Sequence, residues 1–321
     1  VRQAYDLCDM RVEIGVSIGF ALYPDHGLDA ATLLRRADVA MYAAKKVHAG
    51  WAAYDPASDL GSAERLALMG QLKAAIRDEQ LVLHWQPRVR LSDGRVAGAE
   101  ALVRWRHPRL GLLAPGVFVP AAEMSSLIVG LTDWVVSAAA RQAAAWARSQ
   151  MHLQVSVNLS ARNLADEDLP DRILLALAGY DAPLERFEFE ITETAFLADP
   201  RRAFSAISRL TELGGRFAID DFGTGYASLS TLRLLPPVAT LKIDRSFVSR
   251  MRVDAADAAV VETIIGLAQR LGIDSVAEGV EDAETYGMLR ELKCSEAQGY
   301  WIARPAEAGV MTDWLAARGG G

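Results

Sequence analysis

Acidic and amide side chains recur in this sequence at the ends of short apolar segments, one segment after another. Side chains of this kind could hold a cation or move a proton. The polar residues are Glu100, Asn158, Glu190, Glu193, Asp220, Asp221, Lys242, Asp244, Glu278, Glu281 and Gln298. Their repetition, rather than any one of them, is the first indication of a functional site.

Several carboxylates gathered in one cleft would repel one another and would be costly to remove from water. Hard divalent cations offset this repulsion, and a set this large predicts two ions that could also activate a water molecule. Carboxylate oxygens with an amide oxygen, and no clustered Cys or His, favour Mg²⁺ or Mn²⁺ over structural zinc. The predicted cofactor is therefore a pair of Mg²⁺ or Mn²⁺ ions.

Each of these residues also has a simpler interpretation when it is taken alone. A lone Glu at a strand end is usually a solvated loop residue, and Asn158 could cap the following helix. Lys242 and Asp244 could form a surface ion pair, and the segment DDFGTG at 220–225 could be a plain turn. Repetition on successive strands favours one shared site over a series of accidents.

The polar residues follow segments that a closed barrel would bring together. Apolar segments alternate with helical patterns, which is typical of parallel strands joined by helical crossovers. The predicted strands are 81–89, 96–105, 153–159, 187–192, 216–221, 240–243, 274–278 and 298–301. The predicted helices between them are 131–149, 161–178, 199–213, 228–235, 255–271 and 282–292.

The turn at Asp93-Gly94 predicts an antiparallel hairpin between the first two of these strands. We therefore predict an α/β fold, a TIM-type (β/α)8 barrel with an antiparallel first strand. The carboxyl ends of the other strands would then meet at one mouth. An open doubly wound sheet is the alternative, although no G-x-G-x-x-G motif follows the first strand.

The first 57 residues have the pattern of a separate, truncated α/β unit. Residues 11–22 alternate like a strand, and Asp29 is the expected N-cap of a helix that continues through Ala44. One strand and one helix cannot bury a core alone. We assign 1–57 to this remnant, 58–80 to a linker and leading helix, and 81–321 to the barrel.

Composition and ends restrict the expected partners and location. The 34 basic and 41 acidic residues argue against duplex nucleic acid. Two distant cysteines, Cys8 and Cys294, are expected to be buried thiols in a reducing, cytoplasmic setting. No apolar run is long enough to span a membrane. The chain lacks an initiator Met, so we interpret it as a fragment whose full-length protein could be membrane-anchored upstream.

Seven ordered segments resemble the bacterial EAL domains, which hydrolyse cyclic di-GMP. Glu100-Ala101-Leu102, within AGAEALVRWRHP, matches the signature tripeptide of that family. The other segments are VSVNLSARNL (155–164), EFEITET (188–194), IDDFGTGYASL (219–229), LKIDRSFV (241–248), VAEGVE (276–281) and QGYW (298–301). Residues 16–46 are similar to the end of a GGDEF (diguanylate cyclase) domain, although the Gly-Gly-Asp-Glu-Phe signature is absent.

The EAL resemblance implies two groups of metal ligands. The implied ligands of the first metal are Glu100, Asn158, Glu190 and Asp220. The residues implied at the second metal are Asp220 as a bridge, Asp221, and Glu278, which contacts the ion or its water and is a candidate general base.

The resemblance also implies roles around the metals. Lys242 would hold the attacking water, and Arg104 would bind a substrate phosphate. The residues implied to line the substrate or second-metal side are Gln86, Glu281 and Gln298. Glu193 would anchor the loop at 222–228, which in the family couples the metal site to a dimer interface.

The implied activity is the cleavage of one phosphodiester of cyclic di-GMP, which gives linear 5'-pGpG, and the implied assembly is a homodimer through the barrel. Two alternatives stay open: a silent receptor that binds cyclic di-GMP, and a barrel of other specificity or purely structural role. The intact set of acidic residues and Lys242 favours the enzyme over the receptor.

Overall fold

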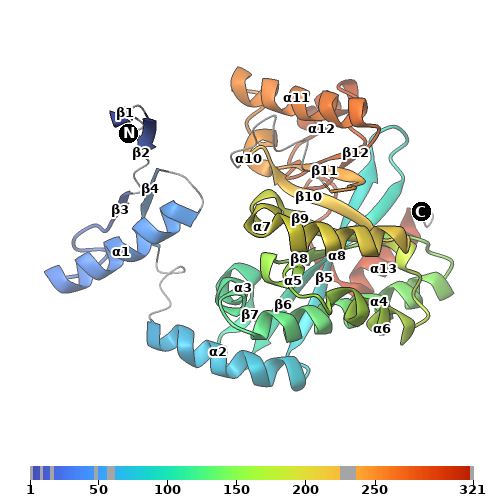
Figure 1. The fold of residues 1–321 in the computed structure, drawn as a ribbon, viewed down its shortest axis with the longest axis horizontal. Helices are drawn as coiled ribbons and strands as arrows, with labels where there is room; N and C mark the ends of the chain where they lie inside the picture. The colour runs from blue at the N-terminus through green and yellow to red at the C-terminus, as the bar shows by residue number, and fades with distance from the viewer. Residues whose placement is uncertain are drawn as a thin grey trace. The chain divides into compact units, whose positions relative to one another are not determined.

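The computed structural model describes residues 3–7, 10–14, 18–46, 50–55, 62–224 and 236–318 (Figure 1). The chain divides into two compact units, Val1–Gln71 and Leu72–Gly321. The division falls inside helix α2 (Ser62–Arg77). Among the described residues, no helix combines the length and the apolar character that crossing a membrane requires.

The second unit is built on a sheet of ten strands, of which β7 (Gly111–Leu113) and β14 (Ala306–Glu307) lie outside the ring and eight close on themselves. The ring consists of β5 (Leu81–Arg90), β6 (Val96–His107), β8 (Gln154–Leu159), β9 (Phe187–Thr192), β10 (Arg216–Phe222), β11 (Thr240–Ile243), β12 (Asp274–Ala277) and β13 (Glu296–Ala297). Strand β5 closes the ring by pairing antiparallel with both β6 and β13, whereas the other neighbours in the ring are parallel. The predicted TIM-type barrel with an antiparallel first strand is confirmed, and the open sheet is excluded.

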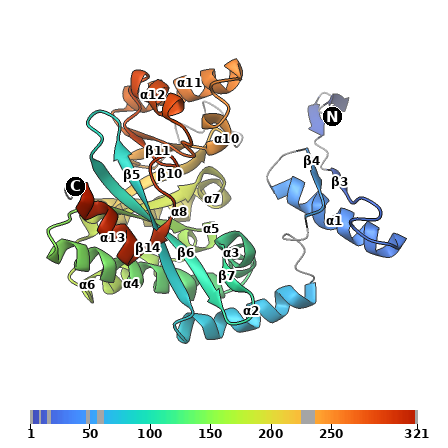
Figure 2. The same ribbon diagram turned by 180° about the vertical axis from the view of Figure 1, so that it is seen from behind.

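The hairpin between β5 and β6 turns at the predicted position (Figure 2). Gly94 has a φ of +72°, a left-handed conformation that glycine adopts at little cost. The Asp93 carboxylate accepts a hydrogen bond from the Arg95 backbone N–H at 3.0 Å. This local chemistry fixes the strand register and therefore decides which β5 residues face the barrel interior.

Helices surround the strands and cover their outward apolar side chains. On β9, Phe187, Phe189 and Ile191 are fully buried and alternate with Glu188 and Glu190, as the two-residue period of a strand requires. The helices that follow α2 in the described residues of this unit are α3 (Pro115–Glu123), α4 (Leu127–Arg148), α5 (Ala161–Leu164), α6 (Leu169–Ala178), α7 (Glu193–Ala198), α8 (Pro200–Glu212), α10 (Arg245–Val248), α11 (Ala255–Leu271), α12 (Ala283–Glu291) and α13 (Ala308–Ala317). The core thus separates into an apolar shell outside the sheet and a largely polar interior.

Two predicted elements of the barrel unit differ from the structure, and further elements were not predicted. The last barrel strand is Glu296–Ala297, so the prediction of 298–301 was wrong; Tyr300 and Trp301 are half exposed in a turn, and their high strand propensity was misleading. The predicted helix 161–178 is broken into α5 and α6. Helix α3, which starts at a proline, was not predicted. The predicted helix 228–235 lies outside the described residues.

The described residues of the first unit form two small sheets, one long helix and the start of α2. Strands β1 (Gln3–Leu7) and β2 (Met10–Ile14) pair antiparallel, whereas β3 (Ile18–Phe20) and β4 (Trp51–Ala53) pair parallel across α1 (Ala30–Lys46). The predicted N-cap is confirmed, since Asp29 Oδ1 accepts from the Thr32 N–H at 2.9 Å. The prediction of one strand over residues 11–22 was wrong, since β2 and β3 belong to different sheets, and the short strands β1 and β4 were not predicted.

Candidate active site

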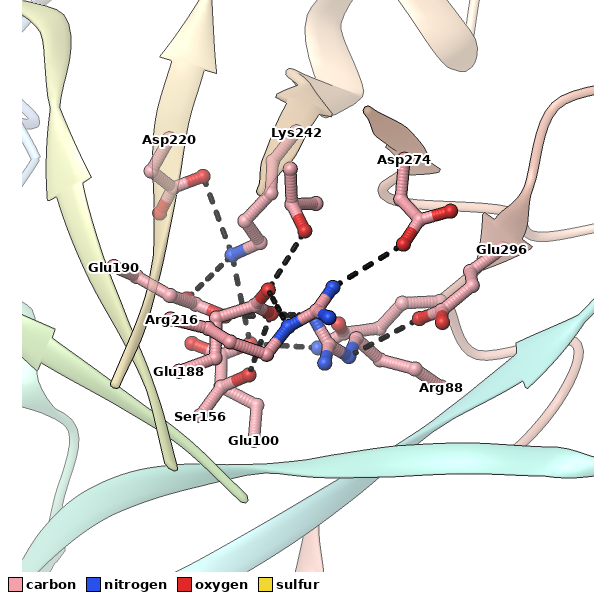
Figure 3. A network of polar contacts seen from close by, with 12 residues as sticks. Arg88, Glu100, Ser156, Glu188, Glu190, Arg216, Asp220, Lys242, Asp274 and Glu296 are labelled. Carbon is pink, nitrogen blue, oxygen red and sulfur yellow. Dashed lines mark hydrogen bonds and ion pairs between the residues drawn. The ribbon is translucent and has the colours of Figure 1, made fainter. Parts of the chain in front are cut away.

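The barrel interior carries polar side chains at two successive levels, because residues two apart on a strand face the same side. The mouth cluster consists of Gln86, Glu100, Asn158, Glu190, Asp220, Asp221, Lys242, Glu278 and Gln298. The lower layer consists of Arg88, Ser156, Glu188, Arg216, Thr240, Asp274 and Glu296. Figure 3 shows side chains of both levels converging from different strands.

Lys242 lies at the centre of the mouth cluster and is 1% exposed. Its Nζ lies 2.6 Å from Glu190 Oε2, 3.2 Å from Asp220 Oδ1 and 2.5 Å from Glu278 Oε1. Burial alone would lower the pKa of Lys242, but Asp220, Glu100 and the other carboxylates raise it well above its usual value. Lys242 is therefore a cation held in place by carboxylates from β9, β10 and the end of β12.

Glu100 is held by two amide side chains, and Lys242 Nζ lies 4.0 Å from its Oε2. Asn158 Nδ2 donates to Glu100 Oε1 at 2.8 Å, and Gln298 Nε2 donates to Glu100 Oε2 at 2.7 Å. Gln298 Nε2 also lies 3.1 Å from Gln86 Oε1. The four residues come from β5, β6, β8 and the turn after β13, so the closed barrel is what brings them together.

Asp220 and Asp221 both reach the mouth although they are consecutive on β10. Asp221 has a φ of +52°, in the left-handed region that Asp tolerates better than most residues. The pairing of β10 with β11 also shifts register between Ile219 and Phe222. The irregular backbone breaks the strict alternation of the strand and brings one carboxylate oxygen each of Asp220, Asp221 and Glu278 within 4.8 Å of one another.

This oxygen group has the properties of a cation site. Burial, together with the neighbouring Asp220, raises the pKa of Asp221 to about 7, and burial raises the pKa of Glu278 to about 8. Within the described part of the chain, Glu190 Oε1 and Gln298 Oε1 are buried acceptors without a hydrogen-bond partner. A set of oxygen donors with spare acceptor capacity fits a hard divalent metal ion.

A cavity of about 660 Å³ adjoins the mouth cluster. Glu100 and Asn158 line one part of it, and Val119, Ile128 and Leu131 of α3 and α4 give it an apolar wall. This size lies in the range that accommodates small ligands. The site therefore combines ionic chemistry with space for a molecule larger than a water or a phosphate ion.

Three predicted residues lie away from the ionic contacts of the mouth cluster. Arg104 is half buried and donates to the Val103 carbonyl at 2.9 Å. Glu281 is exposed, and no hydrogen bond or ion pair joins it to the cluster among the described residues. Glu193 is buried, its two carboxylate oxygens have no partner in the described ranges, and burial raises its pKa.

Sequence reasoning missed the lower layer. Arg88 is 2% exposed, and its Nη1 lies 2.5 Å from Glu188 Oε2. The signal was available, because Glu188 and Glu190 are two apart on one strand and must face the same side. Arg88 stands two positions from Gln86 on β5 for the same reason.

Comparison with known proteins shows the family to which this barrel belongs. The sequence model of one family, the EAL domain, matches residues 69–305. The chain belongs to the EAL domain family. Within this EAL domain, the tripeptide Glu100-Ala101-Leu102 lies on β6, where Glu100 faces the mouth cluster and Leu102 lines the cavity.

Two curated relatives of the EAL domain match nearly all of the chain. An uncharacterized signaling protein of Caulobacter vibrioides is 42% identical over 305 residues, which cover 95% of this chain and 37% of that protein. The bifunctional diguanylate cyclase/cyclic di-GMP phosphodiesterase MucR of Pseudomonas aeruginosa is 38% identical over 310 residues, 96% of this chain and 45% of that protein. The chain thus spans less than half the length of these relatives.

A solved structure described as "PaMucR Phosphodiesterase, c-di-GMP complex" shares the fold of the barrel unit. The TM-score is 0.73 at 38% sequence identity, and the match covers 76% of this chain and 99% of that one. The EAL barrel is therefore shown by both sequence and structure.

Proposed function

We propose that this chain hydrolyses cyclic di-GMP to linear 5'-pGpG as a metal-dependent phosphodiesterase. The observation that carries the proposal is the mouth cluster, an oxygen-donor site with a buried lysine beside a cavity of about 660 Å³. The names of the EAL relatives, and the solved structure that is 38% identical and described as a c-di-GMP complex, support this substrate.

The residues divide the chemistry between them. The proposed ligands of two Mg²⁺ or Mn²⁺ ions are Glu100, Asn158, Glu190, Asp220, Asp221 and Glu278, with Asp220 shared. Such ions, when bound, lower the pKa of a water molecule and offset the charge of a phosphate. Lys242 holds the attacking water and adds fixed positive charge, while Glu278 accepts a proton from that water.

The remaining site residues bind and orient the nucleotide. Arg104 offers a planar guanidinium to a phosphate, while Gln86, Glu281 and Gln298 line the substrate side and Glu193 anchors the loop at 222–228. A dinucleotide anion approaches a chain of net charge −7, so Arg104, Lys242 and the metal ions must make the local charge positive.

The test is incubation of the purified chain with cyclic di-GMP and Mg²⁺, with and without a chelator, followed by chromatography of the products. Glu100→Ala is expected to form no 5'-pGpG, and Glu262→Ala, an exposed change on α11, is expected to retain wild-type turnover. Binding of cyclic di-GMP without any product would instead identify a receptor. A chain that neither binds nor cleaves it would belong to a barrel of other function.

We further propose that residues 1–57 are the C-terminal part of a GGDEF-like domain, followed by a linker and leading helix at 58–80 and the EAL barrel at 81–321. The β3–α1–β4 arrangement and the resemblance of residues 16–46 support this assignment. Because the Gly-Gly-Asp-Glu-Phe signature is absent, the chain is expected to form no cyclic di-GMP from GTP. Detectable product from GTP would refute this view of the unit.

The family resemblance also leads us to propose a homodimer through the barrel, and the two distant cysteines lead us to propose a cytoplasmic site of action. Sedimentation of the purified chain over a range of concentrations tests the assembly. A monomer at micromolar concentration would refute the dimer and leave the hydrolase proposal intact.

A further inference from the structure

Arg88 is the centre of the lower layer, directly beneath the mouth cluster (Figure 3). Its Nη1 lies 2.5 Å from Glu188 Oε2, and its Nε lies 3.4 Å from Glu296 Oε2. Glu188 is held in turn by the Thr240 hydroxyl, which donates to Oε1 at 2.7 Å. The guanidinium is therefore fixed from two sides inside the barrel.

The same guanidinium also lies near the mouth cluster. Arg88 Nη1 lies 4.0 Å from Glu190 Oε1, the oxygen that lacks a hydrogen-bond partner within the described ranges. The other oxygen of Glu190 accepts from Lys242 at 2.6 Å. Glu190 thus lies between two cations, one at the mouth and one in the lower layer.

The neighbouring strand leaves room for this arrangement. Gly98 pairs with Arg88 across the β5–β6 hairpin. A Cβ at this position would lie 3.1 Å from Arg88 Nη2 and 2.6 Å from the Gln154 carbonyl oxygen. A glycine on β6 therefore permits a guanidinium where a larger side chain would displace it.

We propose that Arg88 is a positioning residue for Glu190, whose carboxylate it orients from below the metal site. The inference rests on the proposed function, in which Glu190 is a metal ligand. Lys242 cannot serve this purpose alone, because the same function requires its Nζ to hold water beside the phosphate. Arg88 can stay in one position during the reaction, because Glu188 and Glu296 hold it in the lower layer, away from the substrate.

Arg216 provides a matched control in the same layer. Its Nε lies 3.7 Å from Glu188 Oε1, and its Nη2 lies 3.2 Å from Asp274 Oδ2. Among the described residues, no ion pair joins Arg216 to Glu190. A change at Arg216 therefore disturbs the lower layer without removing the cation that faces Glu190.

The experiment is calorimetric titration of the purified full chain with Mg²⁺ alone, with no nucleotide present. Arg88→Met is expected to weaken Mg²⁺ binding about tenfold or more, the usual scale for residues that orient metal ligands. Arg88→Lys keeps the charge and is expected to recover most of the affinity, and Arg216→Gln is expected to bind within about twofold of wild type. The thermal unfolding of each variant in chelator confirms that it is folded.

Wild-type affinity in folded Arg88→Met would overturn the inference, as would equal weakening in Arg216→Gln. If Arg88→Met does not fold, Arg88→Met combined with Glu188→Gln removes both charges of the ion pair. The Mg²⁺ affinity of this double variant then tests the inference in the same way. A wild-type chain that binds no divalent ion would refute the proposed function and the inference together. Metal binding by the wild type that is insensitive to Arg88 would refute the inference alone.

Discussion

Glu188 and Glu190 stand two residues apart on β9, are equally buried, and behave in opposite ways. Burial alone would raise the pKa of Glu188, but Arg88 and the hydrogen bond from Thr240 lower it below its usual value. For Glu190, burial and the neighbouring Glu100 raise the pKa well above its usual value, against the opposing effect of Lys242. Burial does not distinguish the two carboxylates; their charged neighbours do.

The two levels of the barrel interior differ in the same sense. Counted as ionised, the mouth cluster sets five carboxylates (Glu100, Glu190, Asp220, Asp221 and Glu278) against one lysine, a balance of −4. The lower layer sets three (Glu188, Asp274 and Glu296) against two arginines, a balance of −1. The lower layer compensates all but one of its charges, whereas the mouth cluster requires further cations. The difference separates a structural layer from a site.

The strongest test of this distinction is one amide substitution at the mouth. Glu100→Gln removes a carboxylate that the metal ions would need, and metal ions supply several kcal/mol to such reactions. Turnover of cyclic di-GMP is expected to fall by about 10³-fold or more. The free energy of unfolding in chelator is expected to fall by only about 1 kcal/mol, because an amide at this position loses one of the two hydrogen bonds that Asn158 and Gln298 donate to Glu100. Product chromatography and denaturant unfolding measure the two effects. Marked destabilisation together with retained turnover would erase the distinction.

The same substitution in the lower layer is expected to do the reverse. Glu188→Gln leaves the Arg88 guanidinium buried without its 2.5 Å partner, and breaking a buried ion pair costs about 3 to 5 kcal/mol. The free energy of unfolding, measured with urea in chelator, should fall by that amount. Glu296→Gln, at 3.4 Å and partly exposed, is the milder control. A loss below about 1 kcal/mol at Glu188 would contradict a self-compensated layer.

The levels should also respond differently to pH. The pKa of Glu278 rises from 4.5 to about 8 through burial, so the folded chain holds this proton more tightly than the unfolded chain does. Its contribution to stability is therefore complete below pH 4.5 and is lost as the pH approaches 8. Glu188, whose pKa is lowered, contributes fully throughout that range.

In chelator, the free energy of unfolding is thus expected to decrease by on the order of a few kcal/mol between pH 5 and pH 8. Glu278→Gln should flatten this dependence, and so should saturating Mg²⁺, which binds the carboxylates in their charged form. Urea unfolding at successive pH values provides the measurement. A wild-type stability that stays level or rises with pH would show that burial does not raise the pKa of Glu278 in the folded chain.

The mouth cluster was largely predictable from sequence, and the lower layer was not predicted although its signal was present. Carboxylates at strand ends are easily recognised because the strands before them are apolar. The Asp93-Gly94 dipeptide predicts the hairpin because it favours a tight turn. Glu188, by contrast, lies inside its strand, where it resembles the solvent-facing residue of an ordinary antiparallel sheet. Only closure of the barrel, a long-range property, makes that face an interior.

Other departures have local causes. The last barrel strand has two residues, Glu296–Ala297, which is too short for any periodicity to be visible. The left-handed φ of Asp221 and the register shift beside it depend on the neighbouring strand, so sequence alone could not show that Asp220 and Asp221 share one mouth. Helix α7 was not predicted, whereas the start of α8 was, since Asp199 caps a helix that begins at Pro200.

The smallest expected effect in the comparison of the mouth cluster with the lower layer concerns Cys294. The thiol is free and 4% exposed, with its Sγ 3.4 Å from Ser275 Oγ and 3.3 Å from the Glu296 carbonyl oxygen, beside the lower layer; Cys8 lies outside the described residues. Burial raises its pKa from 9.0 to about 11, so at pH 8 the reactive thiolate is about a hundredfold scarcer than in the unfolded chain.

Alkylation of Cys294 by iodoacetamide should therefore be slow in the wild type and limited by local opening. Glu188→Gln, which loosens the adjacent layer, is expected to accelerate it about tenfold, and Glu100→Gln at the mouth should leave it unchanged. Mass spectrometry of the peptide that contains Cys294 separates its labelling from that of Cys8. Equal rates in the two variants would mean that the mouth cluster and the lower layer open as one unit. The barrel interior would then be a single polar core, without a separate structural layer beneath the site.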